Sequence, residues 1–215
     1  MPGVLVTLRP LGLLVPPILW LALQPASAHS LKELEDQLFK REPFVEFVNR
    51  PAAGFTLTDA GGRAVSLSDY RRKVVVLWFI YTNCPDICPL QSEKLASIQT
   101  KVNRTPMRDI VEFMTVTTDP ARDTPDALKA YGPAHGLEPA NWVFLTSGAD
   151  KPAATRGIAK RYGLEFTPGE DGMLMHGAVT HVIDKSGNLR ARFHGLDFGE
   201  TNLILYVNAL SNDDH

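Results

Sequence analysis

Two cysteines, Cys84 and Cys88, are the only thiols in this chain of 215 residues. They are separated by three residues in the stretch YTNCPDICPLQSEK, and a proline directly follows each of them. Three kinds of chemistry suit such a pair: a structural disulfide, a dithiol that cycles with a disulfide, and a soft metal site. The choice depends on the compartment and on the elements that position the two side chains.

A structural disulfide is the ordinary role of a lone cysteine pair in an exported protein. Here it would close a very short loop and stabilise the fold by only about 2 kcal/mol in the chain-entropy model. On one helix the two Cβ atoms would lie ~5–6 Å apart, beyond the ~3.5–4.5 Å of a disulfide, so a bridge needs a bent turn. A nearby helix N-terminus also lowers thiol pKa values. We therefore expect metal or redox chemistry.

Two thiolates at this spacing can bind one ion from one side, and soft sulfur donors select Cu(I), followed by Zn(II). A third ligand must then come from elsewhere in the chain. Of the six histidines, four are expected to be solvated rather than ligating, because they lie at the termini, in a polar turn or beside exposed arginines: His29, His215, His135 and His194.

His176 differs, because it stands in GMLMHGAVTHVID at the start of a predicted strand that a sheet could set beside the strand ending at Tyr81. From the residues alone it is a candidate third donor, and a satisfied structural histidine is the alternative. Met173 and Met175 beside it are soft donors too, although loop methionines usually only pack. His181, five residues further on, points to the opposite face of an extended chain.

The elements around the cysteines alternate between strands and helices. The apolar run KVVVLWFIY at 73–81 is typical of a strand covered on both faces, and ligands of open α/β sheets usually bind past the carboxyl ends of such strands. Helices are predicted at 90–102, 125–131, 152–162 and 200–210, and strands at 110–116, 142–145, 178–184 and 189–194. This alternation predicts an α/β fold with a central mixed sheet flanked by helices.

The N-terminal part contains a predicted targeting segment. Residues 1–28 hold one arginine, a 13-residue apolar run and the small-residue site Ala26-Ser27-Ala28, which together predict a secretory signal cleaved before His29. The run is shorter than the ~20 residues of a spanning helix and contains two prolines, so an uncleaved membrane anchor is less favoured. A new N-terminus at His29 would offer an α-amine and an imidazole as a further weak Cu(II) site.

Two further segments complete the predicted organisation. Residues 29–50 are expected to form a helical extension, from Ser30 to about Phe47, and a linker. Residues 51–212 are expected to form one domain that opens on a β-hairpin around Gly61-Gly62.

Charge and composition exclude some functions. The chain has 22 basic and 24 acidic residues, a net charge of −2, and no basic patch that would indicate nucleic acid binding. Past the predicted signal, no segment is long and apolar enough to cross a membrane. We therefore expect an exported protein of the bacterial periplasm, monomeric and without a membrane span after cleavage.

Three stretches carry a resemblance to a known family. They are FTLTDAGGRAVSLSDYRRKVVVLWFIYTNCPDICP, then TVTTDPARDTPDALKAY, then a histidine eleven residues before the glycine of DKSG. From about residue 50 to residue 210 the chain resembles the Sco/SenC family of copper-binding thioredoxin-fold proteins. The resemblance implies a thioredoxin-like fold with an N-terminal β-hairpin extension, and copper held by Cys84, Cys88 and His176.

The resemblance also implies a function and partners. A copper metallochaperone of this kind binds Cu(I) and Cu(II) and helps to assemble the dinuclear copper centre of cytochrome c oxidase. Its partners would be the copper-centre subunit of that oxidase and other copper chaperones. Asp86 matches the family's acid between the cysteines. Asp119 matches an acidic position near its metal, with a turn or helix-capping role as the alternative.

The chain also departs from the family pattern. The family commonly follows its histidine with Ser or Thr and places Tyr before the next strand, whereas Gly177 and His181 occupy these places here. The contacts around the metal are therefore expected to differ in detail.

Three functions are consistent with these residues. Two sulfurs and one nitrogen leave Cu(I) open to ligand exchange, as a chaperone requires, whereas structural zinc prefers four protein ligands and the sequence offers no convincing fourth. A thiol-disulfide oxidoreductase that reduces a partner's cysteines is the rival, although its usual motif has two intervening residues and faces a cis-proline that MLMHGAVT lacks. A copper or redox sensor is the third, and we do not expect a classical enzyme.

Overall fold

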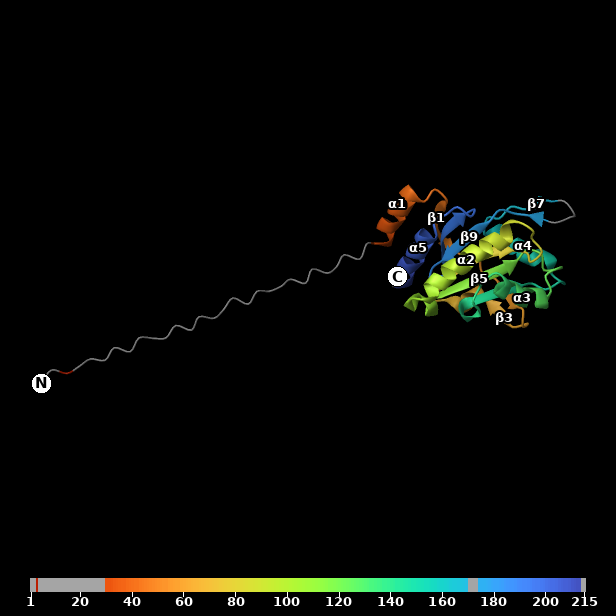
Figure 1. The fold of residues 1–215 in the computed structure, drawn as a ribbon, viewed down its shortest axis with the longest axis horizontal. Helices are drawn as coiled ribbons and strands as arrows, with labels where there is room; N and C mark the ends of the chain where they lie inside the picture. The colour runs from red at the N-terminus through yellow and green to blue at the C-terminus, as the bar shows by residue number, and fades with distance from the viewer. Residues whose placement is uncertain (1–2, 4–29, 170–173, 214–215) are drawn as a thin grey trace.

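The computed structural model describes residue 3, residues 30–169 and residues 174–213 (Figure 1). His29, Met173, His215 and all of the predicted signal except Gly3 lie outside the described residues. None of the helices in the described part of the chain has the length and apolar character needed to span a membrane.

One mixed sheet of eight strands forms the centre of the described domain (Figure 1). Its order is β1-β10-β9-β4-β5-β6-β2-β3. β4, β5 and β6 run parallel, and β9 pairs antiparallel with the other side of β4. The bounds are β1 Val45–Pro51, β2 Thr56–Asp59, β3 Ala64–Ser66, β4 Val74–Ile80, β5 Val111–Thr117, β6 Trp142–Thr146, β9 Val179–Ile183 and β10 Asn188–His194.

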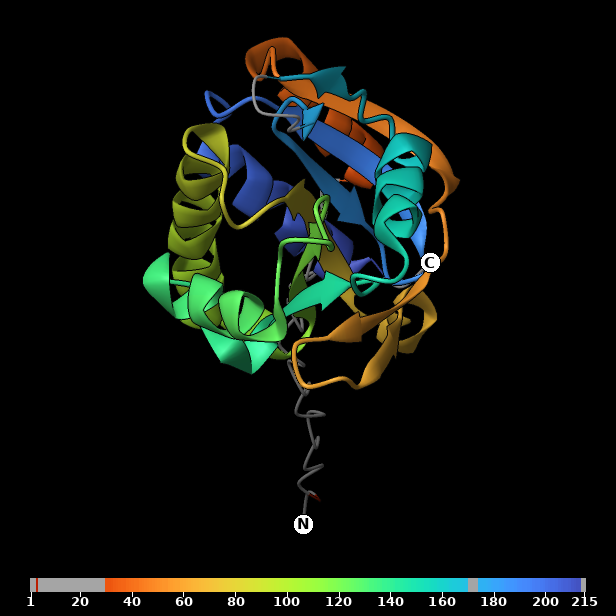
Figure 2. The same cartoon turned by 90° about the vertical axis from the view of Figure 1, so that its right-hand side faces the viewer.

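Helices cover both faces of this sheet, as Figure 2 shows with α2 and α3 on one side and α4 on the other. Trp78 and Ile80 of β4 belong to the core formed with α1, α2, α3 and α5, while Leu77 and Phe79 belong to the core formed with α4 and the hairpin. All seven residues of β4 are buried, because successive side chains face two different cores. The helices are α1 Leu31–Arg41, α2 Ile87–Asn103, α3 Pro125–Ala134, α4 Pro152–Arg161 and α5 Glu200–Asn212, with short 3₁₀ helices η1 Leu67–Tyr70, η2 Pro106–Asp109 and η3 Pro139–Asn141.

The predicted α/β fold with a central mixed sheet flanked by helices is therefore confirmed. The hairpin around Gly61-Gly62 is also present, because β2 and β3 pair antiparallel across this turn and β2 joins the sheet beside β6. Gly62 has a positive φ of 82°, a conformation that glycine adopts without steric cost.

The prediction of a helix from Ser30 to about Phe47, followed by a linker, is wrong in its second half. α1 ends at Arg41, and residues 45–51, expected as the end of a helix and a linker, form the edge strand β1. β1 pairs antiparallel with β10, so it is part of the central sheet. Pro43 explains why the helix stops, because a proline disfavours helical backbone in the residue before it. The partner strand lies about 140 residues away in the sequence, so local periodicity does not reveal the pairing.

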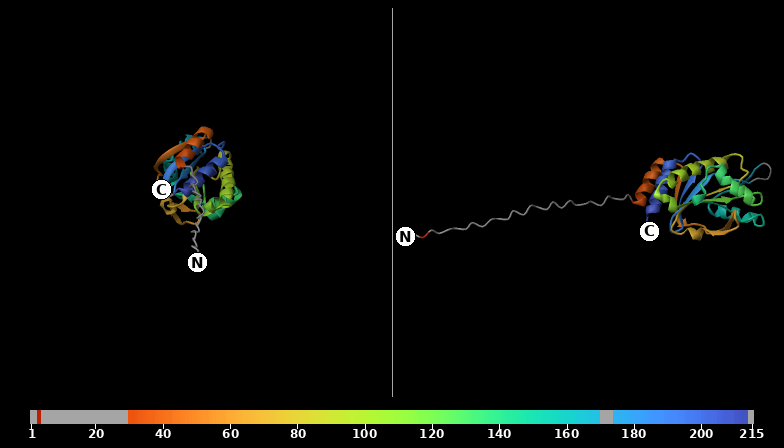
Figure 3. Two further views of the ribbon diagram at one scale, coloured as in Figure 1. Left: turned by 90° about the vertical axis from the view of Figure 1, so that its left-hand side faces the viewer. Right: turned by 60° about the horizontal axis from the view of Figure 1, so that its bottom comes forward.

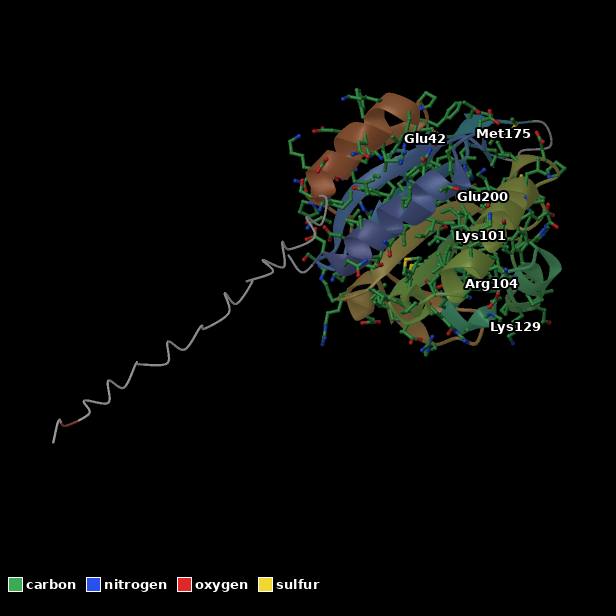
Figure 4. All side chains as sticks on the ribbon, turned by 60° about the vertical axis from the view of Figure 1, so that its left-hand side comes forward. Glu42, Lys101, Arg104, Lys129, Met175 and Glu200 are labelled. Atoms are coloured by element: carbon green, nitrogen blue, oxygen red, sulfur yellow. The ribbon has the colours of Figure 1, made fainter. Side chains whose placement is uncertain are left out.

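A two-stranded ribbon was not predicted. β7 (Thr167–Pro168) pairs antiparallel with β8 (Leu174–Met175), just before His176. Strands of two residues are too short to show a period-2 pattern in the sequence. The ribbon places Met175 on the surface with 54 % of its area exposed, and this residue is labelled in Figure 4.

Polar contacts hold α5 against its neighbouring helices. Lys101 of α2 and Glu200 of α5 form an ion pair at 2.5 Å and are labelled in Figure 4. Glu42, buried just after α1, accepts hydrogen bonds from the backbone N–H of Gly199 and the side-chain amide of Asn202, both at 2.7 Å. A carboxylate at this place satisfies these two N–H groups at the start of α5. It is also stabilised by the positive end of the helix dipole.

Candidate metal centre

Cys84 and Cys88 lie where β4 passes into α2. β4 ends at Ile80 and α2 begins at Ile87, so Cys84 is in the connecting loop and Cys88 is in the first turn of the helix. Both are free thiols, and only 8 % of Cys84 and 2 % of Cys88 is exposed. The backbone N–H of Cys84 donates to the carbonyl of Tyr81 at 3.2 Å, which bends the loop. The predicted place past the carboxyl end of a buried strand is confirmed.

The side chains of Cys84 and Cys88 interact with each other. The side chain of Cys88 lowers the pKa of Cys84, and the backbone N–H groups of Asp86 and Cys88 lower it further against the effect of burial. The side chain of Cys84, together with burial, raises the pKa of Cys88. The two thiols therefore titrate as a pair, with thiolate character at Cys84. A thiolate is the form that binds metals and attacks disulfides.

His176 reaches the same end of the sheet from the segment between β8 and β9. Its Nδ1 lies 3.0 Å from the carbonyl oxygen of Gly177 and must carry a proton to donate there. Nε2 then keeps its lone pair and lies 3.4 Å from the hydroxyl of Thr118, which also donates to the carbonyl of Ile80 at 3.3 Å. Burial lowers the pKa of His176, so the ring is neutral at neutral pH. This is the protonation state in which imidazole binds a metal.

Aromatic rings flank the imidazole of His176. Tyr81 and Phe166 both meet it edge to face, with centroid distances of 6.5 Å and 5.4 Å. Burial and the neighbouring side chain of Cys84 raise the pKa of Tyr81. Tyr81 thus touches both the cysteine loop and the histidine.

The donors share one end of the sheet without forming a closed site. In the described part of the chain, no group of three or more His, Cys, Asp or Glu side chains is close enough together to hold an ion. The charge of Cys84 nevertheless acts on His176 and opposes the effect of burial on its pKa. The arrangement is therefore two neighbouring thiols with an imidazole nearby whose Nε2 makes only a long contact, at 3.4 Å.

The two acids singled out in the sequence lie in different settings. Asp86 is exposed and occupies the N-cap position of α2, although its side chain makes no capping hydrogen bond. Asp119 follows β5, and its carboxylate forms an ion pair with Arg122. Its backbone N–H donates to the hydroxyl of Thr117 at 2.9 Å. Roles for these acids beside a metal stay predictions.

Asp123 is a buried acid that the sequence analysis did not select. Only 3 % of it is exposed, and its carboxylate accepts hydrogen bonds from Thr82 and Thr117. Burial raises the pKa of Asp123, and these donors act in the opposite direction. The only signal in the sequence is its place one residue before Thr124, which caps α3 through its side chain. That position does not predict burial.

The other histidines in the described part of the chain make contacts elsewhere in the fold. His181 belongs to the core on the α4 side of the sheet, as expected from strand alternation, and burial lowers its pKa to about 4. His194 is half exposed and contacts Glu46 at 3.1 Å. His135 was expected to be solvated, but its side chain is only 20 % exposed because it packs on Tyr131 with a centroid distance of 4.3 Å.

Comparison with known proteins places this arrangement in a family. A model of the SCO1/SenC family matches residues 46–207. The chain belongs to the SCO1/SenC family. One relative is the mitochondrial SCO2 homologue of Bos taurus, which is 27 % identical over 176 residues, with 78 % of this chain and 60 % of the relative covered. The chain spans about half the length of the curated relatives it matches first.

Solved structures of SCO1/SenC proteins share the fold. BsSco, described with a disulfide switch and as a member of the Sco family of cytochrome c oxidase assembly proteins, has a TM-score of 0.67 and 24 % identity, with 77 % of this chain and 96 % of that chain covered. The copper-bound ScoI of Bradyrhizobium japonicum has a TM-score of 0.56 and 25 % identity, with 74 % and 98 % covered. The thioredoxin-like fold implied by the sequence resemblance is confirmed.

Proposed function

We propose that this chain is a copper metallochaperone that holds copper with Cys84, Cys88 and His176. It passes the ion to the copper-centre subunit of cytochrome c oxidase during assembly of the dinuclear centre. The observation that carries the proposal is the thiolate-thiol pair at the β4–α2 junction with a neutral imidazole at the same end of the sheet. The copper bound to a relative and the oxidase-assembly role of the Sco family support it.

Each donor is prepared for copper in a different way. Cys84 already has thiolate character, and Cys88 would release its proton when a metal binds. The Nδ1–H of His176 is directed at the carbonyl of Gly177, which fixes the ring tautomer and leaves Nε2 for the metal. Nε2 gives up only a 3.4 Å contact with Thr118. The donor set therefore fits a soft cation without loss of strong hydrogen bonds.

Three donors suit transfer better than permanent storage. A copper ion with two sulfurs and one nitrogen keeps room for an incoming thiolate, so a partner can displace the donors one at a time. Cu(I) is stable when bound by two thiolates alone, whereas Cu(II) favours nitrogen ligands and a higher coordination number. The imidazole is therefore proposed to matter most for Cu(II).

Export to the periplasm belongs to the same proposal. It rests on the pattern of residues 1–28 alone. N-terminal sequencing of the exported protein should find His29 as the first residue, and an intact Met1 would contradict it.

A thiol-disulfide reductase is the second candidate, favoured by the interaction of the two thiols and by the lowered pKa of Cys84. The Cys84 thiolate would attack one sulfur of a partner disulfide, and the other sulfur would leave as a thiolate. Cys88 would lose its proton and attack Cys84 in the mixed disulfide. The partner would then leave with both cysteines reduced, and Cys84 and Cys88 would be joined.

Anaerobic titration of the reduced protein with Cu(I) separates the two candidates. The metallochaperone binds one equivalent, and alkylation of the cysteines abolishes binding. A protein that reduces a model disulfide and ignores Cu(I) would instead be the reductase. Oxidation to the Cys84–Cys88 disulfide should release Cu(I) in step with thiol loss, because a disulfide sulfur is a poor donor.

A further inference from the structure

A buried carboxylate joins two segments of the proposed copper site. Asp123 lies between β5 and α3 and is 3 % exposed. The backbone N–H of Thr82 donates to its two oxygens at 3.1 Å and 3.2 Å, and the Thr82 hydroxyl donates at 2.5 Å. The hydroxyl of Thr117 donates to the same carboxylate. Among the described residues, no Lys or Arg forms an ion pair with Asp123, so neutral donors satisfy it.

Each of the two threonines lies close in the sequence to a residue that is, or contacts, a proposed metal donor. Thr82 stands two residues before Cys84, at the start of the cysteine loop. Thr117 ends β5, and the next residue, Thr118, places its hydroxyl on Nε2 of His176. The Asp123 side chain therefore contacts both the start of the cysteine loop and the end of β5, next to the residue that contacts the His176 imidazole.

The chemistry of this contact favours a carboxylate. Burying an ionised carboxylate without a cation costs free energy. A neutral amide would connect the two loops at a lower desolvation cost. Three donors converge here, however, and only a group that accepts at both oxygens satisfies them all. An asparagine of the same size would turn an N–H₂ group toward at least one donor. The contact is therefore sensitive to the loss of one acceptor.

We propose that Asp123 is a positioning residue that fixes the cysteine loop relative to His176. This inference rests on the proposed copper function. Cu(I) binding depends weakly on the relative placement, because the two thiolates come from one loop. Cu(II) binding depends on it strongly, because nitrogen and sulfur must meet at one ion.

The substitution Asp123→Asn tests the proposal, with Asp126→Asn as the matched control. Asp126 is an exposed acid in the first turn of α3. Asp123→Asn should weaken Cu(II) binding by about 10- to 100-fold, the usual cost of losing a partner that orients a metal ligand, and should shift the thiolate-to-Cu(II) absorption band. Cu(I) affinity should change less than Cu(II) affinity, and Asp126→Asn should leave both unchanged. Wild-type Cu(II) affinity and spectrum in Asp123→Asn would overturn the proposal.

A second pair of variants keeps the test valid if Asp123→Asn does not fold. Thr82→Val removes the hydroxyl that donates to Asp123 with little change in shape, and Thr82→Ser keeps it. Thr82→Val should reproduce the weaker Cu(II) binding and the shifted band, and Thr82→Ser should keep the wild-type affinity and band. Identical Cu(II) binding by these two variants would count against Asp123 as a positioning residue.

A measurement without metal separates failure of this proposal from failure of the copper function. In the copper-free protein, Asp123→Asn should shift the NMR signals of both the Cys84 amide and the His176 ring, whereas Asp126→Asn should not. If the wild-type protein binds no copper, the proposed function fails, yet joint shifts still support the positioning role. Shifts confined to Thr82 would reject it.

Discussion

His176 and His181 are five residues apart, and the sheet gives them opposite environments. His176 lies before β9 and is partly exposed, and its Nδ1 donates to Gly177 while Nε2 makes only a long contact. His181 lies inside β9 and is fully buried. It meets Phe79 and Tyr162 edge to face, with centroid distances of 5.8 Å and 5.2 Å.

The ring nitrogens show what this difference means for metal binding. Those of His181 lie 3.3 Å and 3.1 Å from the carbonyl oxygens of Leu77 and Tyr162. A neutral ring has one proton, which best serves the shorter contact, and the other nitrogen faces a carbonyl in a packed core. Both ring nitrogens of His181, inside the strand, are therefore used in contacts within the core. His176, at the end of the sheet, keeps one ring nitrogen available for a metal.

Replacing both cysteines should have the largest effect on copper. Cys84→Ser with Cys88→Ser is expected to abolish measurable Cu(I) binding, because hydroxyl oxygen is a poor ligand for this soft ion. Anaerobic titration of a folded sample checks this. Stoichiometric Cu(I) binding by the double variant would show that the thiols are not the donors.

His176→Ala should have the next largest effect. Cu(II) binding is expected to be lost, whereas Cu(I) affinity should fall by less than about tenfold, a factor equal to about 1.4 kcal/mol. Two thiolates already suit Cu(I), but Cu(II) needs the nitrogen. Titration with each ion gives the two affinities.

His181→Gln is the matched control for that comparison. It should leave the affinities for both copper ions unchanged, because His181 lies on the other face of the sheet. The comparison is reversed if His181→Gln abolishes Cu(II) binding while His176→Ala preserves it.

Acid should destabilise the protein through His181. Its pKa is about 4 in the fold, below the usual value near 6.5, so the unfolded chain binds more protons between these pH values. The stabilisation is present above pH 6.5 and is lost as the pH falls toward 4. At 1.36 kcal/mol per pKa unit, the free energy of unfolding falls by about 3 kcal/mol over this range. The wild type should therefore lose more free energy of unfolding over this range than His181→Gln. Equal losses in denaturant titrations would mean that His181 does not titrate there.

Asp119→Asn should have the smallest effect. It removes an ion pair with a half-exposed arginine, so the free energy of unfolding should fall by less than about 1 kcal/mol. Any loss of Cu(II) affinity should be smaller than that of His176→Ala. A loss of equal size would make Asp119 a ligand rather than a neighbour of the metal.

The sequence predicts the elements whose signals are local. The apolar run of β4 and the helix after it place Cys84 and Cys88 at a strand end, and the structure agrees. Strand β1 is missed because its partner β10 lies far away in the sequence. Asp123 is missed for a similar reason, since its burial depends on Thr82, which is 41 residues away. Contacts of this kind follow from the packed fold rather than from periodicity.

The position of α1 matters for handling the protein on a surface. Glu35 of α1 accepts a hydrogen bond from Tyr206 of α5 at 2.7 Å, and these helices lie together at one end of the domain while β7 lies at the other (Figures 1 and 3). A capture tag joined before residue 30 or after residue 213 would therefore hold the protein by the end remote from β7. A sensor chip or electrode loaded in this way would leave the β7 end open to copper donors and acceptors in solution.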